Sequence, residues 1–148
     1  MRRETLLLRV TADPRYARAI REEVLHFAYA WKMRPADVEE FVTAIGEAFA
    51  NAVEHAHTLD PITIGLRADA GDKLLATVTD FGVGFDTRRA EGVLPPPGTE
   101  RGRGFALMRR YCDLVSIRSQ PGEGTSVMLG RYLRASRDEQ KGRRQHAS

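Results

Sequence analysis

The sequence predicts an α+β fold, a two-layer sandwich in which helices cover one face of a mixed, mostly antiparallel sheet. Residues 37–57 carry apolar side chains at spacings of three and four, which is typical of a long helix with one buried face. Residues 62–66 and 73–79 are rich in alternating apolar residues and flank an Ala-Gly-Asp turn, which indicates a hairpin. Strands joined by such tight turns pair antiparallel, so the helices and the sheet form separate layers.

The N-terminal part predicts a strand followed by two helices. Residues 4–10 are short and leucine-rich, which favours an opening strand, and Asp13 with Pro14 predicts the start of a helix that runs to about Met33. The apolar stripe expected on this helix is Ala17, Ile20, Val24, Phe27 and Ala28. The second helix begins at Pro35 or Asp37 and ends near His57, and its expected stripe is Val38, Phe41, Val42, Ile45, Phe49, Ala52, Val53 and Ala56.

The C-terminal part predicts one more helix and two more strands. Residues 81–102 are rich in glycine, proline and charge, and a loop of this length inside a domain is often functional. A short helix is expected over residues 103–112. Strands over residues 115–119 and 125–132 then flank a Gln-Pro-Gly-Glu-Gly turn.

The positive charge of the chain is concentrated in its last fifteen residues. The formal net charge is +3, and residues 134–148 hold five basic and two acidic side chains, which leaves 18 of each sign in residues 1–133. We therefore expect one domain over residues 1–133 and a basic, disordered tail over residues 134–148. Because the folded part is formally neutral, direct binding of nucleic acid is not expected.

Cysteine content and hydropathy exclude several classes of protein. Cys112 is the only cysteine, which excludes a disulfide scaffold and a cysteine-rich zinc module. No uncharged run approaches the roughly 18–20 residues that a membrane span needs, and the apolar run near the N-terminus is too short for a signal peptide. We expect a cytoplasmic protein without membrane association.

Glu47 and Asn51 lie opposite the apolar stripe of the second helix. They are four residues apart and therefore neighbours on the helix surface. A solvated polar face is one interpretation. However, Ala44 and Ala50 share this face, where a solvent-exposed surface more often carries long charged side chains. A groove occupied by a ligand is the other interpretation.

Three glycine motifs follow at positions where a backbone could approach a ligand. The first is Asp80-x-Gly82-x-Gly84 directly after a strand, and the second is Gly102-x-Gly104 leading into a helix, whose free amides can bind phosphate. The third, residues 122–125, precedes the final strand. Each motif alone is also compatible with an ordinary turn.

Together the four motifs resemble the GHKL (Bergerat-fold) ATPase and kinase superfamily. The sequence is most similar to bacterial anti-sigma-factor serine/threonine kinases of the RsbW type, over about residues 4–133. Residues 47–56 resemble the helix motif of that family. A GxxxxGK[ST] phosphate loop is absent from the sequence, so a P-loop ATPase is excluded.

The resemblance implies an adenine pocket at the end of the hairpin. Asp80 would accept a hydrogen bond from the adenine amino group, a donor that a carboxylate can recognise. Gly82 and Gly84 would allow close approach of the base, and Thr125 would lie near it.

The resemblance also implies a phosphate and metal site. Asn51 would bind Mg²⁺ through its amide oxygen, the remaining ligands being water and the triphosphate. Gly102, Gly104 and the amides that open the helix at residues 103–106, Phe105 included, would hold the phosphates. Residues 87–101 would form the lid.

In a kinase, Glu47 would accept the proton of the incoming hydroxyl as the phosphoryl group transfers. Arg101 or Arg103 would stabilise the negative charge on that phosphate, or would simply be solvated. His55 is more often a packed histidine than a catalytic one.

Two functions therefore remain open. The first is an ATP- and Mg²⁺-dependent serine/threonine kinase that binds a sigma factor as a homodimer and phosphorylates a STAS-domain antagonist. The alternative is an anti-sigma or regulatory binding module. In that case a bound nucleotide changes its affinity for the partner, and no phosphoryl group is transferred.

Overall fold

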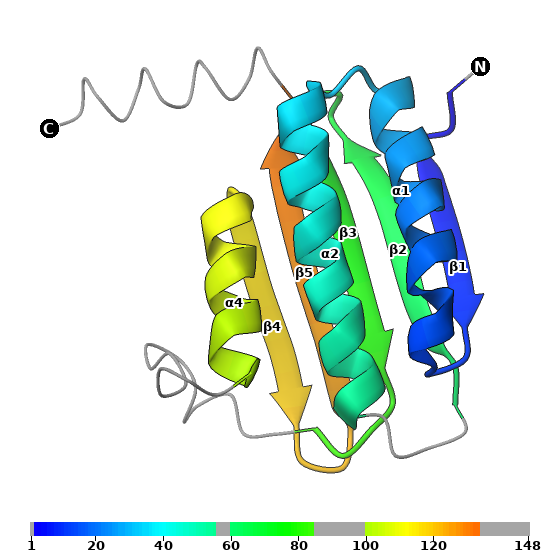
Figure 1. Ribbon diagram of the computed structural model, residues 1–148, viewed down its shortest axis with the longest axis vertical. Helices are drawn as coiled ribbons and strands as arrows, with labels where there is room; N and C mark the ends of the chain where they lie inside the picture. Colours follow the sequence, from blue (N-terminus) through cyan, green and yellow to red (C-terminus); the bar gives the residue numbers. More distant parts are fainter. Residues whose placement is uncertain (1, 56–59, 85–99, 134–148) are drawn as a thin grey trace, which may run out of the picture.

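One antiparallel sheet of five strands forms the base of the molecule, in the order β1-β2-β3-β5-β4 (Figure 1). The computed structural model describes residues 2–55, 60–84 and 100–133, with residues 100–103 described by their backbone alone. The strands are β1 (Thr5–Val10), β2 (Ile62–Asp69), β3 (Lys73–Asp80), β4 (Leu114–Gln120) and β5 (Gly124–Tyr132). The sheet is antiparallel at every pairing, whereas the sequence predicted a mixed, mostly antiparallel sheet.

In the part of the chain that the structure describes, three α-helices cover one face of this sheet, which confirms the predicted α+β sandwich (Figure 1). They are α1 (Ala17–Ala30), α2 (Pro35–His55) and α4 (Glu100–Tyr111), and a short 3₁₀ turn, η1 (Pro14–Tyr16), precedes α1. Asp13 caps that turn by accepting a hydrogen bond from the Arg15 amide at 2.9 Å. The first helix ends three residues earlier than predicted, and Lys32 beyond it has φ +59°.

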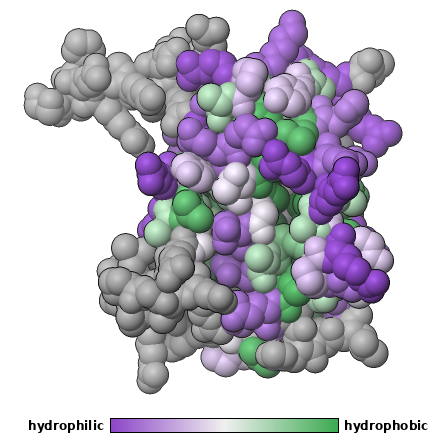
Figure 2. Space-filling model, in the orientation of Figure 1, coloured by the Kyte–Doolittle hydropathy of each residue, from purple (hydrophilic) through white to green (hydrophobic). Residues whose placement is uncertain are grey.

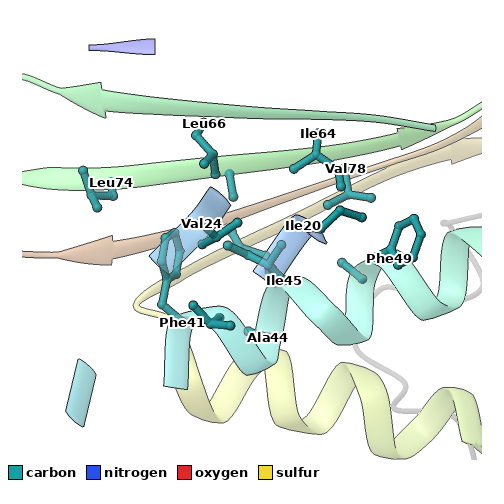
Figure 3. Close-up of a cluster of buried hydrophobic side chains, with 14 of the residues drawn as sticks. Ile20, Val24, Phe41, Ala44, Ile45, Phe49, Ile64, Leu66, Leu74 and Val78 are labelled. Atoms are coloured by element: carbon teal, nitrogen blue, oxygen red, sulfur yellow. The ribbon is translucent and has the colours of Figure 1, made fainter. Parts of the chain in front are cut away.

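The core lies between the sheet and α2, which packs between α1 and α4 (Figures 1 and 3). Ile20 and Val24 of α1 and Phe41 and Ile45 of α2 point toward the strands in Figure 3. The strand residues that meet them are Ile64, Leu66, Leu74 and Val78. The predicted stripes are buried with three exceptions: Ala17 is exposed, Val53 is half-buried, and Ala56 lies outside the described residues.

The second helix is buried on more than the predicted stripe. Ala44 and Ala48 are 0% and 1% exposed, because α2 is flanked by helices on both sides. Ala50 is exposed. The alanines near Glu47 and Asn51 therefore do not line one continuous open groove. Ala44 and Ala48 are buried within the protein, and Ala50 lies on the surface.

A buried ion-pair cluster closes the core at the N-terminal end of α2. Arg131 of β5 is 1% exposed; its Nη2 donates to Asp37 Oδ1 at 2.6 Å, and its Nη1 donates to Glu40 Oε2 at 2.9 Å. Nη1 also donates to the Tyr111 carbonyl at 2.7 Å, at the last residue of α4. One guanidinium thus joins α2, α4 and β5. We refer to these four residues as the Arg131 cluster.

The outer surface of the helix layer is largely hydrophilic, with small apolar areas between the helices (Figure 2). Within the described part of the chain, no helix is long and apolar enough to cross a membrane.

Candidate functional site

Asp80 lies at the C-terminal end of β3 and is 4% exposed. Its Oδ1 accepts a hydrogen bond from the Gly82 amide at 2.9 Å. Burial raises the pKa of Asp80, because the charged form loses water. The amides of Gly82 and Thr125 and the charge of His55 act in the opposite direction. Asp80 is therefore a buried acceptor whose carboxylate has lost its water, and the two amides and His55 offset this loss only in part.

The Asp80-x-Gly82-x-Gly84 motif and the glycine motif of residues 122–125 are held against each other at this end of the sheet. Gly122 donates its amide hydrogen to the Val83 carbonyl at 2.7 Å. Gly84 and Gly124 have φ of +66° and +80°. A Cβ on Gly84 would lie 2.0 Å from the Gln120 carbonyl oxygen, and one on Gly124 would lie 2.2 Å from that of Asp80. A side chain at either position would separate the two turns, so both glycines are needed for the site to assemble.

Thr125 lies directly opposite Asp80 in the antiparallel register of β3 and β5. On its other side it lies opposite Ser119 of β4, and the two hydroxyl oxygens are 2.7 Å apart. The predicted neighbourhood of Asp80 and Thr125 is therefore present. Ser119 was not predicted, although its place on the strand before the glycine turn offered a signal, since alternation puts it on the same face.

Glu47 and Asn51 lie on α2 where Gly104 of α4 approaches that helix. A Cβ on Gly104 would lie 3.4 Å from Glu47 Oε2 and 3.4 Å from Asn51 Nδ2. Glu47 and Asn51 are both half-buried, and Asn51 Nδ2 has no hydrogen-bond partner among the described residues. The Glu47–Asn51 pair of α2 and the Gly102-x-Gly104 motif of α4 are thus in contact.

The last turn of α2 joins this pair of motifs to Asp80. A Cβ on Gly82 would lie 2.3 Å from the His55 carbonyl oxygen and 3.1 Å from Asp80 Oδ1. His55 has a side chain that is 19% exposed, and its charge lowers the pKa of Asp80. All four motifs therefore meet at one end of the molecule, the lower end in Figure 1. His55, expected to be a packed residue, borders the site.

The helix after the glycine-rich loop begins at Glu100, three residues before the predicted start at Arg103. Gly102 and Gly104 therefore lie within its first turns. The amides of residues 104–106 fall where a helix already supplies backbone acceptors, so the free amides lie nearer its start than predicted. The side chains of Arg101 and Arg103 lie outside the described residues. The lid was predicted over residues 87–101; residues 87–99 of it also lie outside the described residues, and residues 100 and 101 belong to α4.

Two other side chains near α4 have packing roles. Phe105 is half-buried and packs against the hydrophobic core. Burial raises the pKa of the Cys112 thiol to about 12, so it is protonated at neutral pH and unreactive as a nucleophile.

Among the described residues, no group of three or more His, Cys, Asp and Glu side chains could hold a metal ion.

A family model for the histidine kinase-like ATPase domain matches residues 10–130. The chain belongs to the histidine kinase-like ATPase family. The expected superfamily resemblance is therefore confirmed, and membership of this ATPase family implies the use of ATP.

Curated relatives of this ATPase-family chain are anti-sigma F factors. That of Pasteuria penetrans is 35% identical over 109 residues, which is 69% of this chain and 73% of the relative. That of Caldanaerobacter subterraneus subsp. tengcongensis is 30% identical over 119 residues, which is 74% of this chain and 82% of the relative. These relatives confirm the resemblance to the anti-sigma-factor group within the family.

Solved structures share the fold of this ATPase-family chain. The RsbU and RsbW domains of a Mycobacterium tuberculosis protein match with a TM-score of 0.67 and 22% identity, over 88% of this chain and 33% of that one. The SiaB–SiaC complex of Pseudomonas aeruginosa matches with a TM-score of 0.61 and 10% identity, over 84% of this chain and 88% of that one. At these identities the likeness concerns the fold alone.

Proposed function

We propose that this protein is an ATP- and Mg²⁺-dependent serine/threonine kinase that acts as a cytoplasmic anti-sigma factor. It binds a sigma factor, works as a homodimer, and phosphorylates a serine or threonine of a STAS-domain antagonist. The relatives named anti-sigma F factor support this role. The observation that carries the proposal is the convergence of Glu47, Asn51 and Gly104 beside Asp80 and its clasped glycine turns.

The nucleotide fits the residues present. Asp80 is a buried acceptor suited to the adenine amino group, and Gly82 and Gly84 place no side chain of their own beside it. At the other side of the site lies Asn51, whose side-chain Nδ2 has no hydrogen-bond partner among the described residues. Its oxygen suits Mg²⁺, which takes most of its remaining ligands from water and phosphate. Bound Mg²⁺ would neutralise charge on the phosphates.

Glu47 is one helical turn from Asn51 and shares its contact with Gly104, which puts a carboxylate next to the phosphate side of the site. In the proposed step, Glu47 orients the substrate hydroxyl and accepts its proton. The hydroxyl oxygen forms a bond to the γ-phosphorus of ATP while the bond from that phosphorus to the bridging oxygen of ADP breaks. The products are ADP, the phosphoprotein and a proton held by Glu47.

The test compares phosphoryl transfer by wild type, Glu47→Gln and Asp80→Asn. Purified protein is incubated with γ-labelled ATP, Mg²⁺ and a panel of STAS-domain proteins, and nucleotide binding is measured separately by the rise in melting temperature. Glu47→Gln should bind ATP like wild type and transfer about 10²–10⁴-fold more slowly. Asp80→Asn should bind ATP about 10–100-fold more weakly than wild type, which separates the two roles.

Three results would contradict parts of the proposal. If Glu47→Gln transfers as fast as wild type, Glu47 is not the base. If wild type binds ATP but labels no STAS protein, while ATP changes its affinity for a sigma factor, the gated module without transfer is correct. If no nucleotide raises the melting temperature, the site assignment is wrong.

A further inference from the structure

A row of three polar side chains crosses the site end of the sheet on the face that the helices cover. Asp80 of β3 lies opposite Thr125 of β5, which lies opposite Ser119 of β4. Each stands two residues from a core side chain of its own strand, namely Val78, Val127 and Ile117. Because side chains alternate along a strand, all three point to the same side as the core.

The hydrogen bonds of Ser119 fix the direction of the whole row. Its Oγ lies 3.1 Å from the Gly124 carbonyl oxygen and 2.7 Å from Thr125 Oγ1. A carbonyl oxygen only accepts, and a serine hydroxyl carries one hydrogen, so Ser119 donates to Gly124. The hydrogen between the two hydroxyls must then come from Thr125. Thr125 Oγ1 is left with a lone pair and no hydrogen for a ligand.

The row therefore offers a ligand two neighbouring acceptors, the Asp80 carboxylate and Thr125 Oγ1. An amino group with two N–H donors matches such a pair, whereas a carbonyl oxygen faces two acceptors and stays unpaired. A buried polar site that leaves a ligand group unpaired rejects that ligand strongly. Adenine carries an amino group on C6 of the purine ring, whereas hypoxanthine, the base of ITP, carries a carbonyl oxygen there.

We propose that Ser119 is the positioning residue that sets base selectivity, by holding the Thr125 hydroxyl as an acceptor so that ATP is preferred over ITP. This inference rests on the proposed nucleotide site. Ser119 is 5% exposed and its oxygen is engaged by Gly124 and Thr125, so it acts through Thr125 and does not touch the base.

The test is the ratio of the dissociation constants for ITP and ATP, measured by calorimetry with Mg²⁺. In Ser119→Ala, the Thr125 hydroxyl is released to rotate and donate to a carbonyl oxygen. The ratio should fall about fivefold, the equivalent of one neutral hydrogen bond. Ser116→Ala is the matched control, because Ser116 is exposed on the same strand and faces away from the site. Taking a ratio within one variant cancels any change in its folded fraction.

A double variant tests whether the effect passes through Thr125. In a Thr125→Val background, Ser119→Ala should leave the ratio unchanged, because there is no hydroxyl left to orient. An equal fall in both backgrounds overturns the inference, as does a ratio for Ser119→Ala that equals that of Ser116→Ala. If wild type binds ATP and ITP equally, this inference alone fails. If wild type binds neither, the proposed function fails and this inference with it.

Discussion

Asp37 near the start of α2 and Asp80 beside its C-terminal end are buried to nearly the same degree, 5% and 4% exposed, but their partners differ. Asp37 accepts from Arg131 at 2.6 Å and from Arg34 at 3.1 Å, so two guanidinium groups share its charge. Asp80 accepts from backbone amides, and among the described residues no arginine or lysine pairs with it. His55 contributes a charge nearby.

The difference separates a carboxylate that is used for folding from one that is available for binding. The Arg131 cluster joins three elements through the Nη1 and Nη2 bonds of one guanidinium, and both carboxylates of the cluster are paired with that cation. At the other end, burial has removed water from Asp80, and no arginine or lysine of the described residues pairs with it. A ligand that donates a hydrogen bond to Asp80 therefore supplies a partner that the protein itself does not provide. A buried acceptor with few partners of its own is suited to ligand binding for this reason.

The largest expected effect is on stability, at the Arg131 end. Arg131→Ala should lower the free energy of unfolding by about 3–5 kcal/mol, because it removes the buried guanidinium that pairs with both Asp37 and Glu40 and leaves Asp37 its ion pair with Arg34. For a domain of this size that is a fall in melting temperature of about 10 °C, measured by calorimetry. Arg118→Ala, at an exposed position of β4, is the control and should change little. Equal melting temperatures for the two variants would show that the cluster adds nothing to stability.

The second effect is on binding, at the Asp80 end. Asp80→Asn should weaken Mg-ATP binding by about 10–100-fold, because an amide nitrogen replaces an acceptor and a charge-assisted hydrogen bond is lost. The nucleotide-free protein should remain as stable as wild type or become more stable, since a buried charge without a cation partner is removed. Both are read from melting curves with and without ligand. A large loss of stability in the nucleotide-free variant would show that Asp80, like Asp37, serves folding.

The smallest effect is a dependence of stability on pH that belongs to Asp80. Because burial raises its pKa in the folded state, the folded chain holds this proton more tightly than the unfolded chain. Its stabilising contribution is full below the ordinary value of 3.8 and is lost as pH rises through the raised value. The stability of Asp80→Asn relative to wild type should therefore increase as pH rises from 3.8 through the raised pKa, measured by urea unfolding. A constant difference would show that the folded pKa is not raised.

Much of the fold and part of the site could be predicted from local sequence. Periodicity identified α2 and the hairpin of β2 and β3, and the glycine motifs identified where backbone segments approach one another. The Arg131 cluster could not be predicted, because Arg131 and Asp37 are 94 residues apart and nothing near either residue specifies the other. Ser119 was missed for a related reason, since its role depends on the register with β5.

The sequence by itself determined which segments are helices and strands, and which short-range motifs would crowd the backbone, because these depend on neighbours along the chain. The tertiary structure decided which buried charge is paired and in which direction a hydroxyl donates. Those properties arise only when β3, β5, β4 and α2 are brought together, where each donor has a limited number of hydrogens and each buried acceptor competes for them.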